Sequence, residues 1–462
     1  MPVNSFENYP MSWKPTLTLT QNPLYLSLAM AMEEDIQNGV LLPGTKLPPQ
    51  RELADYLDLN LSTITRAFKV CEKKGLICGV VGKGTFISSD AAAERVFLKN
   101  DYSQPIIDMG AIMPHSLSNQ KITQYIQILA KEPDSYKLFQ YGFSEQESYE
   151  QAASLKWLEK SGLHTSQDRL LFSTGGQNGI MGILSALFEP GDRIGADPTT
   201  YPGFKLAAKL LGIQVVPLYV PNAKITKESL LSVIKNERIK GLYLIPDFHN
   251  PTALTMPLET RKMIAEILDE HPIILIEDAI NSLLHPNPLP PIASLQRTRT
   301  FYLSSLSKVL APSLRLGIID CPPFYKNAVF ESLYAMNIGV SQFMLHLFAR
   351  LVTSEEGELI RQSRQEEIMK RNQYINQFFS QDKLLGDLHS PLRFLILSPD
   401  QNASAFESQA LKRGLQIYAV DRFYVGAKPS EPGIRIAITA PTSWEDYTQG
   451  VKILVDTYMA CK

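Results

Sequence analysis

A lysine and an arginine, set seven residues apart among small hydroxyl side chains, could together hold a phosphorylated aldehyde. The segment 304–317 contains Lys308 and Arg315 along with several serines, including Ser305 and Ser307. An amine is an effective Schiff-base nucleophile when burial or a nearby cation lowers its pKa, and the planar fork of arginine suits a phosphate. Lys308 is therefore the first candidate for a covalent anchor of pyridoxal 5'-phosphate. Taken alone, the segment fits a plain surface loop equally well.

The elements that must position this lysine form an alternation of strands and helices. Residues 299–303 have the pattern of a buried strand, which places Lys308 at its carboxyl end, where open α/β sheets build their sites. Further apolar runs separated by helical stretches predict a largely parallel sheet covered on both faces. These runs are 170–173, 193–196, 214–218, 241–245 and 273–276. After Val340, long helices and shorter alternating strands predict a smaller C-terminal subdomain.

The loops that follow these strands carry residues suited to the parts of a pyridine aldehyde phosphate. Gly175, Gly176 and Gln177 lie in a glycine turn that opens a helix, and the free N–H groups of such a turn would receive a phosphate. Tyr201, held between two prolines, could stack on a flat ring, although a place in the core is the commoner role of a tyrosine. Asn250 offers an amide to a ring oxygen, while Asn-Pro alone indicates only a turn.

Two charged residues lie at the end of an apolar strand or within one. Asp278 follows a buried run, and a carboxylate there must be paired or hydrogen-bonded to remain charged. A protonated pyridine nitrogen would be such a partner, and its protonation makes the ring an electron sink. Arg435 lies inside an apolar strand near the C-terminus, where a substrate carboxylate could neutralise it. The alternatives are a capping role for Asp278 and an internal salt bridge for Arg435.

Residues 23–88 have the pattern of a small DNA-binding module. The stretches 23–38, 50–57 and 62–74 predict three helices, the third capped by Ser62, and 76–81 with 85–88 predict a hairpin. This order is that of a winged helix-turn-helix, whose third helix enters the major groove. Between Ser62 and Ser88 five cations stand against a single acid, Glu72, which indicates a phosphate-binding patch; a solvated helix face is the alternative.

This module resembles the DNA-binding domain of the GntR family of bacterial regulators. The resemblance is carried by residues 42–54 (LPGTKLPPQRELA), 62–68 (STITRAF) and 75–87 with the glycines of the wing. Gln50 stands where the family more often has serine. The residues that we expect on double-stranded DNA are Arg51, Ser62, Thr63, Thr65, Arg66, Lys69, Gly82, Lys83 and Gly84.

The rest of the chain, residues 108–462, resembles the aminotransferase-like domain of fold-type I pyridoxal phosphate enzymes. The resemblance is carried by the order glycine turn, tyrosine, Asn-Pro, Asp, Lys, Arg. It implies that Lys308 forms the Schiff base, Asp278 pairs with the pyridine nitrogen, Asn250 binds the ring oxygen, Tyr201 stacks on the ring and Arg435 binds the α-carboxylate of a substrate. Lys308, Asp278 and Tyr201 would be the catalytic residues. The expected phosphate-binding residues are Gly175, Gly176, Gln177, Ser305, Ser307 and Arg315, joined by Tyr141 from a neighbouring subunit.

Two positions depart from that pattern. Ile280 stands where the family usually has a tyrosine after the strand aspartate, so a hydroxyl partner for the ring oxygen is missing. Ala253 replaces the glycine of Pro-Thr-Gly. We expect the cofactor to remain, but loss of the phenol should change the pKa of the Schiff base and the ease of catalysis.

A GntR-type reader fused ahead of such a domain is the architecture of the MocR subfamily of transcriptional regulators. The resemblance implies a homodimer that binds DNA and senses an amino compound, or the cofactor itself, through an aldimine at Lys308. The alternatives are a working class I/II aminotransferase and a DNA-binding scaffold whose cofactor fold is inactive.

Composition and length agree with a folded protein of two or three domains. The chain has 462 residues, 44% of them hydrophobic, and a formal net charge of -2, so any nucleic-acid surface must be a local patch. Without a signal peptide or a membrane-spanning run, we expect a cytosolic location. The expected parts are a tail (1–22), the DNA-binding module (23–88), a linker (89–107) and the large domain (108–462), whose subdomain is 341–462. The seven histidines form no metal site, and Cys71, Cys78, Cys321 and Cys461 are expected to be reduced thiols.

Overall fold

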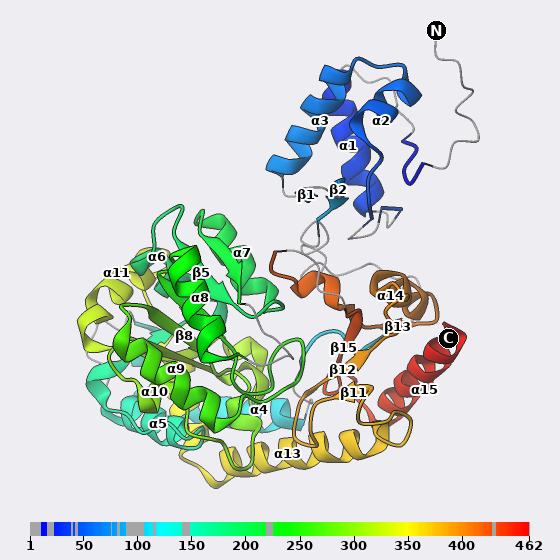
Figure 1. Ribbon diagram of the computed structural model, residues 1–462. Coiled ribbons are helices and arrows are strands. Elements are labelled where there is room, and N and C mark those ends of the chain that lie inside the picture. Colours follow the sequence, from blue (N-terminus) through cyan, green and yellow to red (C-terminus); the bar gives the residue numbers. More distant parts are fainter. Residues whose placement is uncertain are drawn as a thin grey trace.

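The computed structural model of the protein describes three groups of elements. It covers residues 11–15, 23–37, 40–41, 45–74, 76–80, 84–88, 106–113, 117–140, 148–218, 225–426 and 431–461. Figure 1 shows the N-terminal elements in blue, a large α/β domain in cyan to yellow-green and a C-terminal subdomain in orange and red. Within the described residues, no helix is both long and apolar enough to cross a lipid bilayer.

The N-terminal elements are three helices and a hairpin. They are α1 (Leu24–Gln37), α2 (Gln50–Leu57), α3 (Leu61–Lys73), β1 (Ile77–Val80) and β2 (Gly84–Ile87), with β1 and β2 antiparallel. In α3, Ile64, Ala67, Phe68 and Cys71 are all buried and form its inward face. Leu24, the first residue of α1, lies beyond this core and is 41% exposed.

Two local features of this module differ from the sequence-based expectations. Ser62 does not cap α3: the N-cap is Asn60, whose side-chain oxygen accepts a hydrogen bond from Ser62 N at 2.9 Å, so the helix starts earlier. Trp13, which lies in the predicted tail, packs in the hydrophobic core of the module and donates its indole N–H to Asp35 Oδ2 at 2.7 Å. Residues before 23 therefore contribute to the packing of α1.

The large domain is built on a seven-stranded sheet. Its strands, in spatial order, are β4 (Leu170–Ser173), β10 (Gly317–Asp320), β9 (Thr300–Ser305), β8 (Ile274–Asp278), β7 (Gly241–Leu244), β5 (Arg193–Ala196) and β6 (Gln214–Pro217). The prediction of a largely parallel sheet is confirmed, with β10 as the exception because it runs antiparallel to both β4 and β9. The sequence analysis did not identify β10, whose apolar run follows Arg315 directly.

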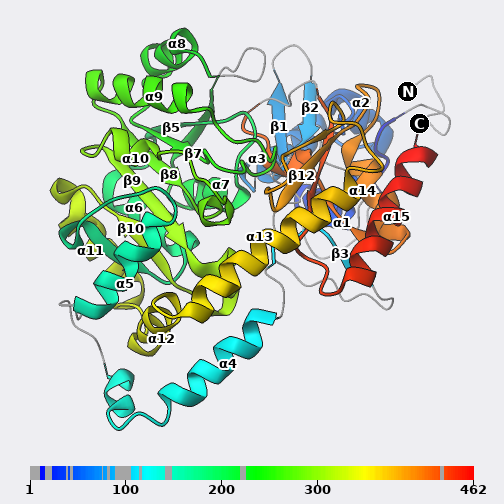
Figure 2. The same cartoon turned by 90° about the horizontal axis from the view of Figure 1, so that it is seen from below.

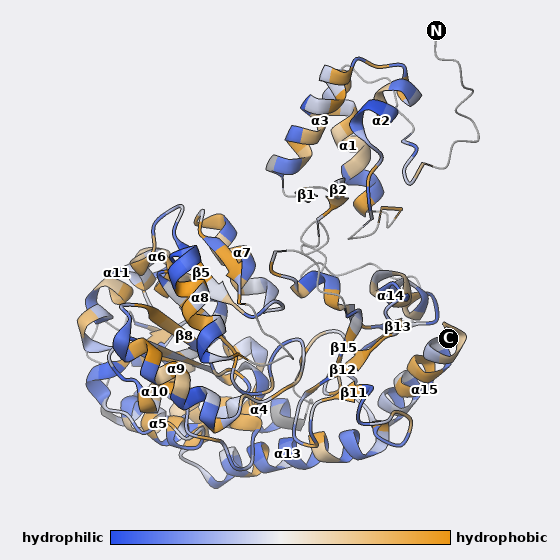
Figure 3. Cartoon of the chain, in the orientation of Figure 1, coloured by the Kyte–Doolittle hydropathy of each residue, from blue (hydrophilic) through white to orange (hydrophobic). Residues whose placement is uncertain are grey.

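Helices cover both faces of this sheet, as predicted. One face packs against α6 (Gly176–Leu187), α7 (Pro202–Leu210) and α11 (Lys326–Asn337). The other face packs against α5 (Ser148–Glu159), α8 (Lys227–Glu237), α9 (Leu258–Glu270) and α10 (Ile292–Leu295). Figure 3 shows hydrophobic strands inside and hydrophilic outer faces on the helices around them. The sheet is therefore a rigid, dry platform, and the loops at its strand ends are fixed by it.

The C-terminal subdomain contains long helices and a smaller sheet, as expected. Its helices are α12 (Gln342–Val352), α13 (Glu355–Ile375), α14 (Ala403–Lys412) and α15 (Trp444–Ala460). The sheet has the order β11 (Leu384–Leu385), β12 (Leu392–Ile396), β15 (Gly433–Ala437), β14 (Tyr418–Ala419).

A strand from the start of the large domain joins this subdomain. β3 (Ile107–Asp108) pairs in parallel with β13 (Leu415–Gln416), and Figure 2 shows β3 beside the C-terminal elements. The predicted linker 89–107 lies mostly outside the described residues, but its last residue, Ile107, is part of this strand. The chain that leaves the DNA-binding module is therefore attached first to the C-terminal subdomain.

Candidate functional site

Lys308 lies where the sequence predicts, directly after a central strand of the large sheet. It ends the short helix η7 (Leu306–Lys308), which follows β9. Its Nζ donates a hydrogen bond to the backbone carbonyl of Ile112 at 2.8 Å. Burial lowers the pKa of Lys308 to about 8; Arg435 lowers it further and Asp278 opposes the shift. A buried amine with a lowered pKa is the form that attacks a carbonyl carbon.

Asp278 is the last residue of the neighbouring strand β8 and is buried. Its Oδ2 accepts a hydrogen bond from the phenol of Tyr243, and its Oδ1 accepts one from Ile280 N at 3.2 Å. Burial raises the pKa of Asp278 to about 6, while both hydrogen bonds and the charge of Lys308 act in the opposite direction. The carboxylate is thus held by two donors and interacts electrostatically with Lys308. It can serve as the partner of a cationic ring nitrogen.

The predicted phosphate-binding residues meet at the N-terminus of α6. Gly175, the N-cap, has a φ of 90°, and a Cβ on it would lie 2.5 Å from Nη2 of Arg315. The same Nη2 donates to Thr174 O at 3.2 Å. Residues 175 and 315 are therefore in close contact, and only glycine lets the guanidinium approach the N-terminus of the helix, so that two groups which bind anions lie side by side.

The hydroxyl and amide groups of this set are hydrogen-bonded within the protein, apart from the side-chain oxygen of Gln177. Ser305 Oγ donates to Ser307 Oγ at 3.0 Å, so the two serines lie together beside the lysine. Gln177 donates from Nε2 to Gly203 O at 2.8 Å, while its Oε1 is buried without a hydrogen-bond partner. A Cβ on Gly176 would lie 2.5 Å from Ile280 Cδ1, so the isoleucine side chain packs against the N-terminus of α6. Together, the hydroxyls, the guanidinium and the helix N-terminus fit a phosphate.

Tyr201 lies among the same charged groups. It precedes Pro202 at the start of α7 and is largely buried. Burial raises its pKa to about 12, and the charges that act on it come from Asp278, Arg315 and Arg435. Its ring packs against the backbone of Gly203, where a Cβ would lie 2.4 Å from the ring. The aromatic face predicted for a flat ligand therefore lies in the site, and it is fixed by the turn that follows it.

Arg435 comes from the other sheet, in β15, and reaches the site from the C-terminal subdomain. Its Nη1 donates to Asn250 Oδ1 at 3.2 Å, and its Nη2 donates to the carbonyl of Gly110. The guanidinium lies over the rings of Tyr418 and Phe423, at 4.9 and 5.1 Å from their centroids. Within the described chain it has no salt bridge to an acid, and its Nε is buried without a partner. The internal salt bridge considered above is therefore not present among these residues.

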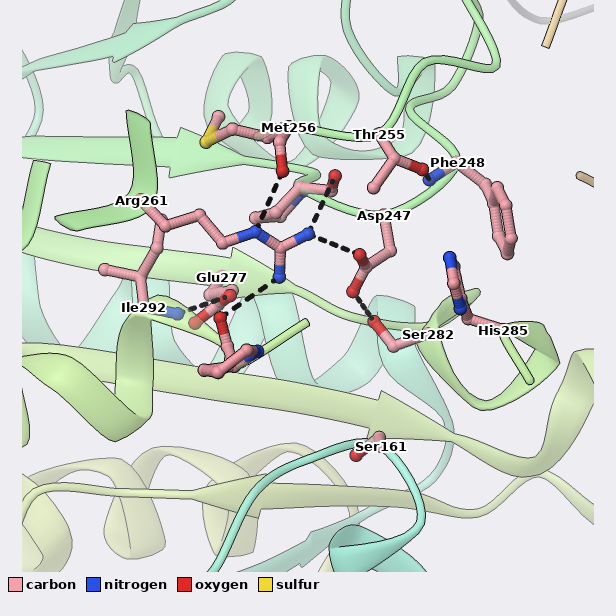
Figure 4. Close-up of polar contacts among 12 residues, drawn as sticks. Ser161, Asp247, Phe248, Thr255, Met256, Arg261, Glu277, Ser282, His285 and Ile292 are labelled. Atoms are coloured by element: carbon pink, nitrogen blue, oxygen red, sulfur yellow. Dashed lines mark hydrogen bonds and ion pairs between the residues drawn. The ribbon is translucent and has the colours of Figure 1, made fainter. Parts of the chain in front are cut away.

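A buried polar network, which Figure 4 shows, holds the loop that carries Asn250. Arg261, fully buried in α9, donates to Asp247 Oδ1 at 2.5 Å and to Met256 O at 3.1 Å. The other oxygen of Asp247 accepts from Ser282 Oγ at 2.6 Å. This network connects the loop after β7, which carries Asn250, to the segment that follows Asp278, the last residue of β8. The loops at the carboxyl ends of two neighbouring strands are thereby fixed to each other.

Sequence reasoning missed three contributors to the site. The carbonyls of Gly110 and Ile112 accept hydrogen bonds from Arg435 and Lys308, and Tyr243 donates to Asp278. Backbone carbonyls leave no signal in a sequence. Tyr243 could have been found only from strand register, because it lies in a continuous apolar run whose two faces look alike. Tyr141 lies outside the described residues.

Most of the expected DNA-contacting residues lie on α3, whereas Arg51 lies on α2 and Gly84 begins β2. Arg51, Ser62, Arg66 and Lys69 are exposed, whereas Thr63 and Thr65 are half-buried. Thr65 Oγ1 donates to Gln50 Oε1 at 2.9 Å, which joins α3 to the start of α2. Gly82 and Lys83 lie outside the described residues, and Gly84 is exposed with a φ of 115°. Lys74, one of the five cations counted in the patch, forms a salt bridge with Glu33 at 2.6 Å.

Two protein families match this chain. Residues 106–454 match the aminotransferase class I and II family, and residues 24–87 match the gntR family of bacterial regulatory proteins. The chain is similar to the uncharacterized HTH-type transcriptional regulator YdeF of Bacillus subtilis strain 168, with 45% identity over 98% of each protein. It is 25% identical to the vitamin B6 salvage pathway transcriptional repressor PtsJ of Salmonella typhimurium, over 70% of this chain and 72% of PtsJ.

Solved structures show the same fold for the larger part. An archaeal alanine:glyoxylate aminotransferase superimposes with a TM-score of 0.69 at 19% identity, over 80% of this chain and 93% of the enzyme. A kynurenine aminotransferase of Pyrococcus horikoshii gives a TM-score of 0.68 at 19% identity, over 79% and 96%. The large domain and its C-terminal subdomain are thus a fold-type I aminotransferase fold.

The chain therefore belongs to the aminotransferase class I and II family and carries a GntR-type helix-turn-helix at its N-terminus. It is a DNA-binding transcriptional regulator of the GntR type fused to an aminotransferase-like domain, the combination of the MocR subfamily.

Proposed function

We propose that this regulator binds pyridoxal phosphate covalently at Lys308 and that an amino compound, or the cofactor itself, controls its binding to DNA through this site. The observation that carries the proposal is that the Lys308 amine, with a pKa of about 8, interacts electrostatically with the Asp278 carboxylate and with Arg315, whose guanidinium lies against the N-terminus of α6. Bound pyridoxal phosphate would supply an aldehyde that reacts with amines and a ring that withdraws electrons when its nitrogen is protonated.

The residues of the site have separate roles in this proposal. Lys308 gives the nucleophilic amine, Asp278 keeps a ring nitrogen protonated, and Tyr201 offers its ring face. The phosphate is bound by the N-terminus of α6 together with Gln177, Ser305, Ser307 and Arg315, and Asn250 binds the ring oxygen. Arg435 binds a carboxylate, because its fork is buried and has only neutral partners among the described residues. An amino acid is therefore a better effector than a simple amine.

The cofactor itself is a second candidate effector within the same proposal. The relative PtsJ of Salmonella typhimurium is a transcriptional repressor of the vitamin B6 salvage pathway. If the present chain acts in the same way, pyridoxal phosphate alone will change DNA affinity, and a further amino compound will not be needed.

The link from the site to the DNA-binding module is a short segment that we name the strap, residues 106–113. Its carbonyls at Gly110 and Ile112 accept the hydrogen bonds of Arg435 and Lys308. A ligand carboxylate and a covalent bond at Nζ would each replace one of these hydrogen bonds. Since the strap includes the last two residues of the predicted linker, ligand binding frees the point at which the DNA-binding module is attached.

We further propose that the chain acts as a homodimer. Helix α4 (Leu117–Leu129) and the short helix η3 (Ser135–Phe139) extend along one side of the molecule in Figure 2. They expose Ile128, Tyr136 and Phe139, at 59%, 61% and 76%. Tyr141, which the family resemblance assigns to a neighbouring subunit's phosphate site, follows directly. A second copy that covers these apolar side chains would also complete that site.

Borohydride reduction followed by peptide mapping tests the covalent site. After incubation with pyridoxal phosphate, reduction should label Lys308 with a stable pyridoxyl group in the wild-type chain and label no lysine in Lys308→Ala. Lys205, which is also buried, is the matched control, and Lys205→Arg should be labelled at Lys308 like the wild type. A label on another lysine, or none, would contradict the proposal.

A working aminotransferase is the second candidate, because Lys308, Asp278 and Arg435 are all present and lie in one site. The alkyl side chain of Ile280 against Gly176, in place of the family's phenol, argues against efficient turnover. Incubation with amino acids and a 2-oxo acid distinguishes the candidates. Repeated conversion of the oxo acid to an amino acid favours the enzyme, whereas a change in DNA affinity without turnover favours the regulator.

A further inference from the structure

Tyr243 approaches Asp278 from inside the sheet and is not used by the proposed function. It lies in β7, is fully buried, and donates its phenolic O–H to Asp278 Oδ2. Its ring is stacked on Phe204, with centroids 3.9 Å apart and planes at 2° to each other. Because the ring is fixed on one side by Phe204 and the hydroxyl by the carboxylate, the side chain has a single defined orientation.

Few groups among the described residues stabilise the ionised Asp278 carboxylate. Two donors from the protein reach it, the phenol of Tyr243 and the backbone N–H of Ile280. Apart from Tyr243, the titratable groups that interact electrostatically with Asp278 are Lys308 and Tyr201. Arg315 and Arg435 in turn lower the pKa values of Lys308 and Tyr201. Glu277, the preceding residue, is directed elsewhere and accepts hydrogen bonds from the backbone of Ile292 and Ala293.

We propose that Tyr243 is a positioning residue for the cofactor: its phenol keeps the Asp278 carboxylate ionised and oriented toward a protonated ring nitrogen. Tyr243 thereby sets the lower pH limit at which the site retains pyridoxal phosphate. This inference rests on the proposed function. It also explains why a tyrosine stands inside an otherwise aliphatic strand, where a phenol without a partner would be costly.

The direction of the effect follows from the hydrogen bonds. Burial raises the pKa of Asp278 to about 6, and the bond from Tyr243 counteracts that rise. Without the phenol the pKa of Asp278 must rise further, so the carboxylate is protonated at a higher pH. A neutral acid attracts a cationic ring nitrogen less than a carboxylate does. Cofactor affinity will therefore be lost at a higher pH on acidification.

The test is a titration of full-length Tyr243→Phe with pyridoxal phosphate from acidic to mildly alkaline pH, followed by visible absorbance. We expect the pH midpoint of cofactor retention to move up by about one unit, so that affinity below the wild-type midpoint falls about tenfold. Tyr302→Phe is the matched control. Tyr302 is also fully buried and donates to Ser161 Oγ at 2.8 Å, so its loss should leave the midpoint unchanged.

A double-mutant cycle separates this role from general packing. With Asp278→Asn there is no carboxylate to ionise, so adding Tyr243→Phe should move neither the midpoint nor the affinity further. A wild-type midpoint in Tyr243→Phe, an equal shift in Tyr302→Phe, or an additive loss in the double variant would each overturn the inference alone. Absence of pyridoxal phosphate binding by the wild-type chain would overturn the proposed function, and the inference with it.

Discussion

Lys308 and Arg435 are two cations of one site, and each donates to a backbone carbonyl of the strap. Arg435 is the second-largest cause, after burial, of the low pKa of Lys308. The arginine that would recognise a carboxylate therefore also activates the amine that would hold the cofactor. Substitutions of Arg435 can therefore test two effects: loss of its charge should change the pH dependence of Lys308, and loss of its bidentate geometry should change the specificity for a carboxylate.

The pH dependence of cofactor attachment should report the pKa of Lys308. Only the neutral amine attacks the aldehyde, so the rate of attachment should rise as the pH increases through about 8 and then level off. In Arg435→Gln the pKa of Lys308 should rise because a neighbouring cation is lost, and the rate curve should move to higher pH. Stopped-flow absorbance measures both curves. A midpoint near 10.5, the ordinary lysine value, would contradict the assignment.

Arg435→Lys should weaken the response to amino acids more than the response to amines without a carboxylate. Lysine cannot form the bidentate contact. We therefore expect the amino-acid concentration that gives half of the response to rise roughly tenfold, as for a lost charge-assisted hydrogen bond. Arg393 is the control: it is buried on the adjacent strand β12 and donates to the carbonyls of Leu384 and Leu385. Fluorescence titration of Arg393→Lys should give wild-type selectivity; equal losses in both variants would contradict a specific role.

The residue types of the site could be predicted from the sequence because each carries a chemical signal. A lysine among serines, an aspartate behind an apolar run and an arginine inside a strand are all unusual. Their place in one site was implied by parallel strands that share a carboxyl edge. The contact between Tyr243 and Asp278 could not be predicted, since it depends on the pairing of Tyr243 with Ile276 across β7 and β8.

At the scale of elements, the strap is the feature that the sequence analysis did not anticipate. Ile107 pairs with Leu415, far along the chain, and Met109 N donates to Gln416 O at 2.8 Å. A strand of two residues has no periodicity to detect. β10 was not predicted for a related reason: it has only four residues, and its apolar residues directly follow the loop that contains Arg315. Asn60 was missed as the cap of α3 because Ser62 has equal capping propensity and only geometry distinguishes them.

Ligand binding should loosen the strap. Amide hydrogen exchange in residues 106–113 should be faster in the protein loaded with pyridoxal phosphate than in the free protein, and faster again with an effector amino acid, because the hydrogen bonds to Ile112 O and Gly110 O are lost. Exchange in β7, in the centre of the sheet, is the internal control and should not change. Slower exchange in the strap on loading would contradict this coupling.

For the whole molecule, the exposed apolar side chains of α4 and η3 predict a dimer. Analytical ultracentrifugation of the wild type should give twice the mass of one chain, 51.8 kDa. The double substitution Tyr136→Glu and Phe139→Glu should give a monomer with weaker pyridoxal phosphate binding, because charge is placed on the contact surface and the partner's Tyr141 is lost. Met459, also exposed and apolar on α15, is the control, and Met459→Glu should remain dimeric. A wild-type monomer would contradict the prediction.

The central proposal is that chemistry at Lys308 controls DNA binding through the strap and the predicted linker, which together span residues 89–113. The most direct test is fluorescence anisotropy with a DNA fragment selected by the protein from a random pool. Affinity is measured with and without pyridoxal phosphate and the common amino acids. The account predicts that at least one of these ligands changes the affinity of the wild type about fivefold or more, and that Lys308→Ala shows no change while it still binds DNA. An equal response in Lys308→Ala, or no response of the wild type to any of these ligands, would contradict it.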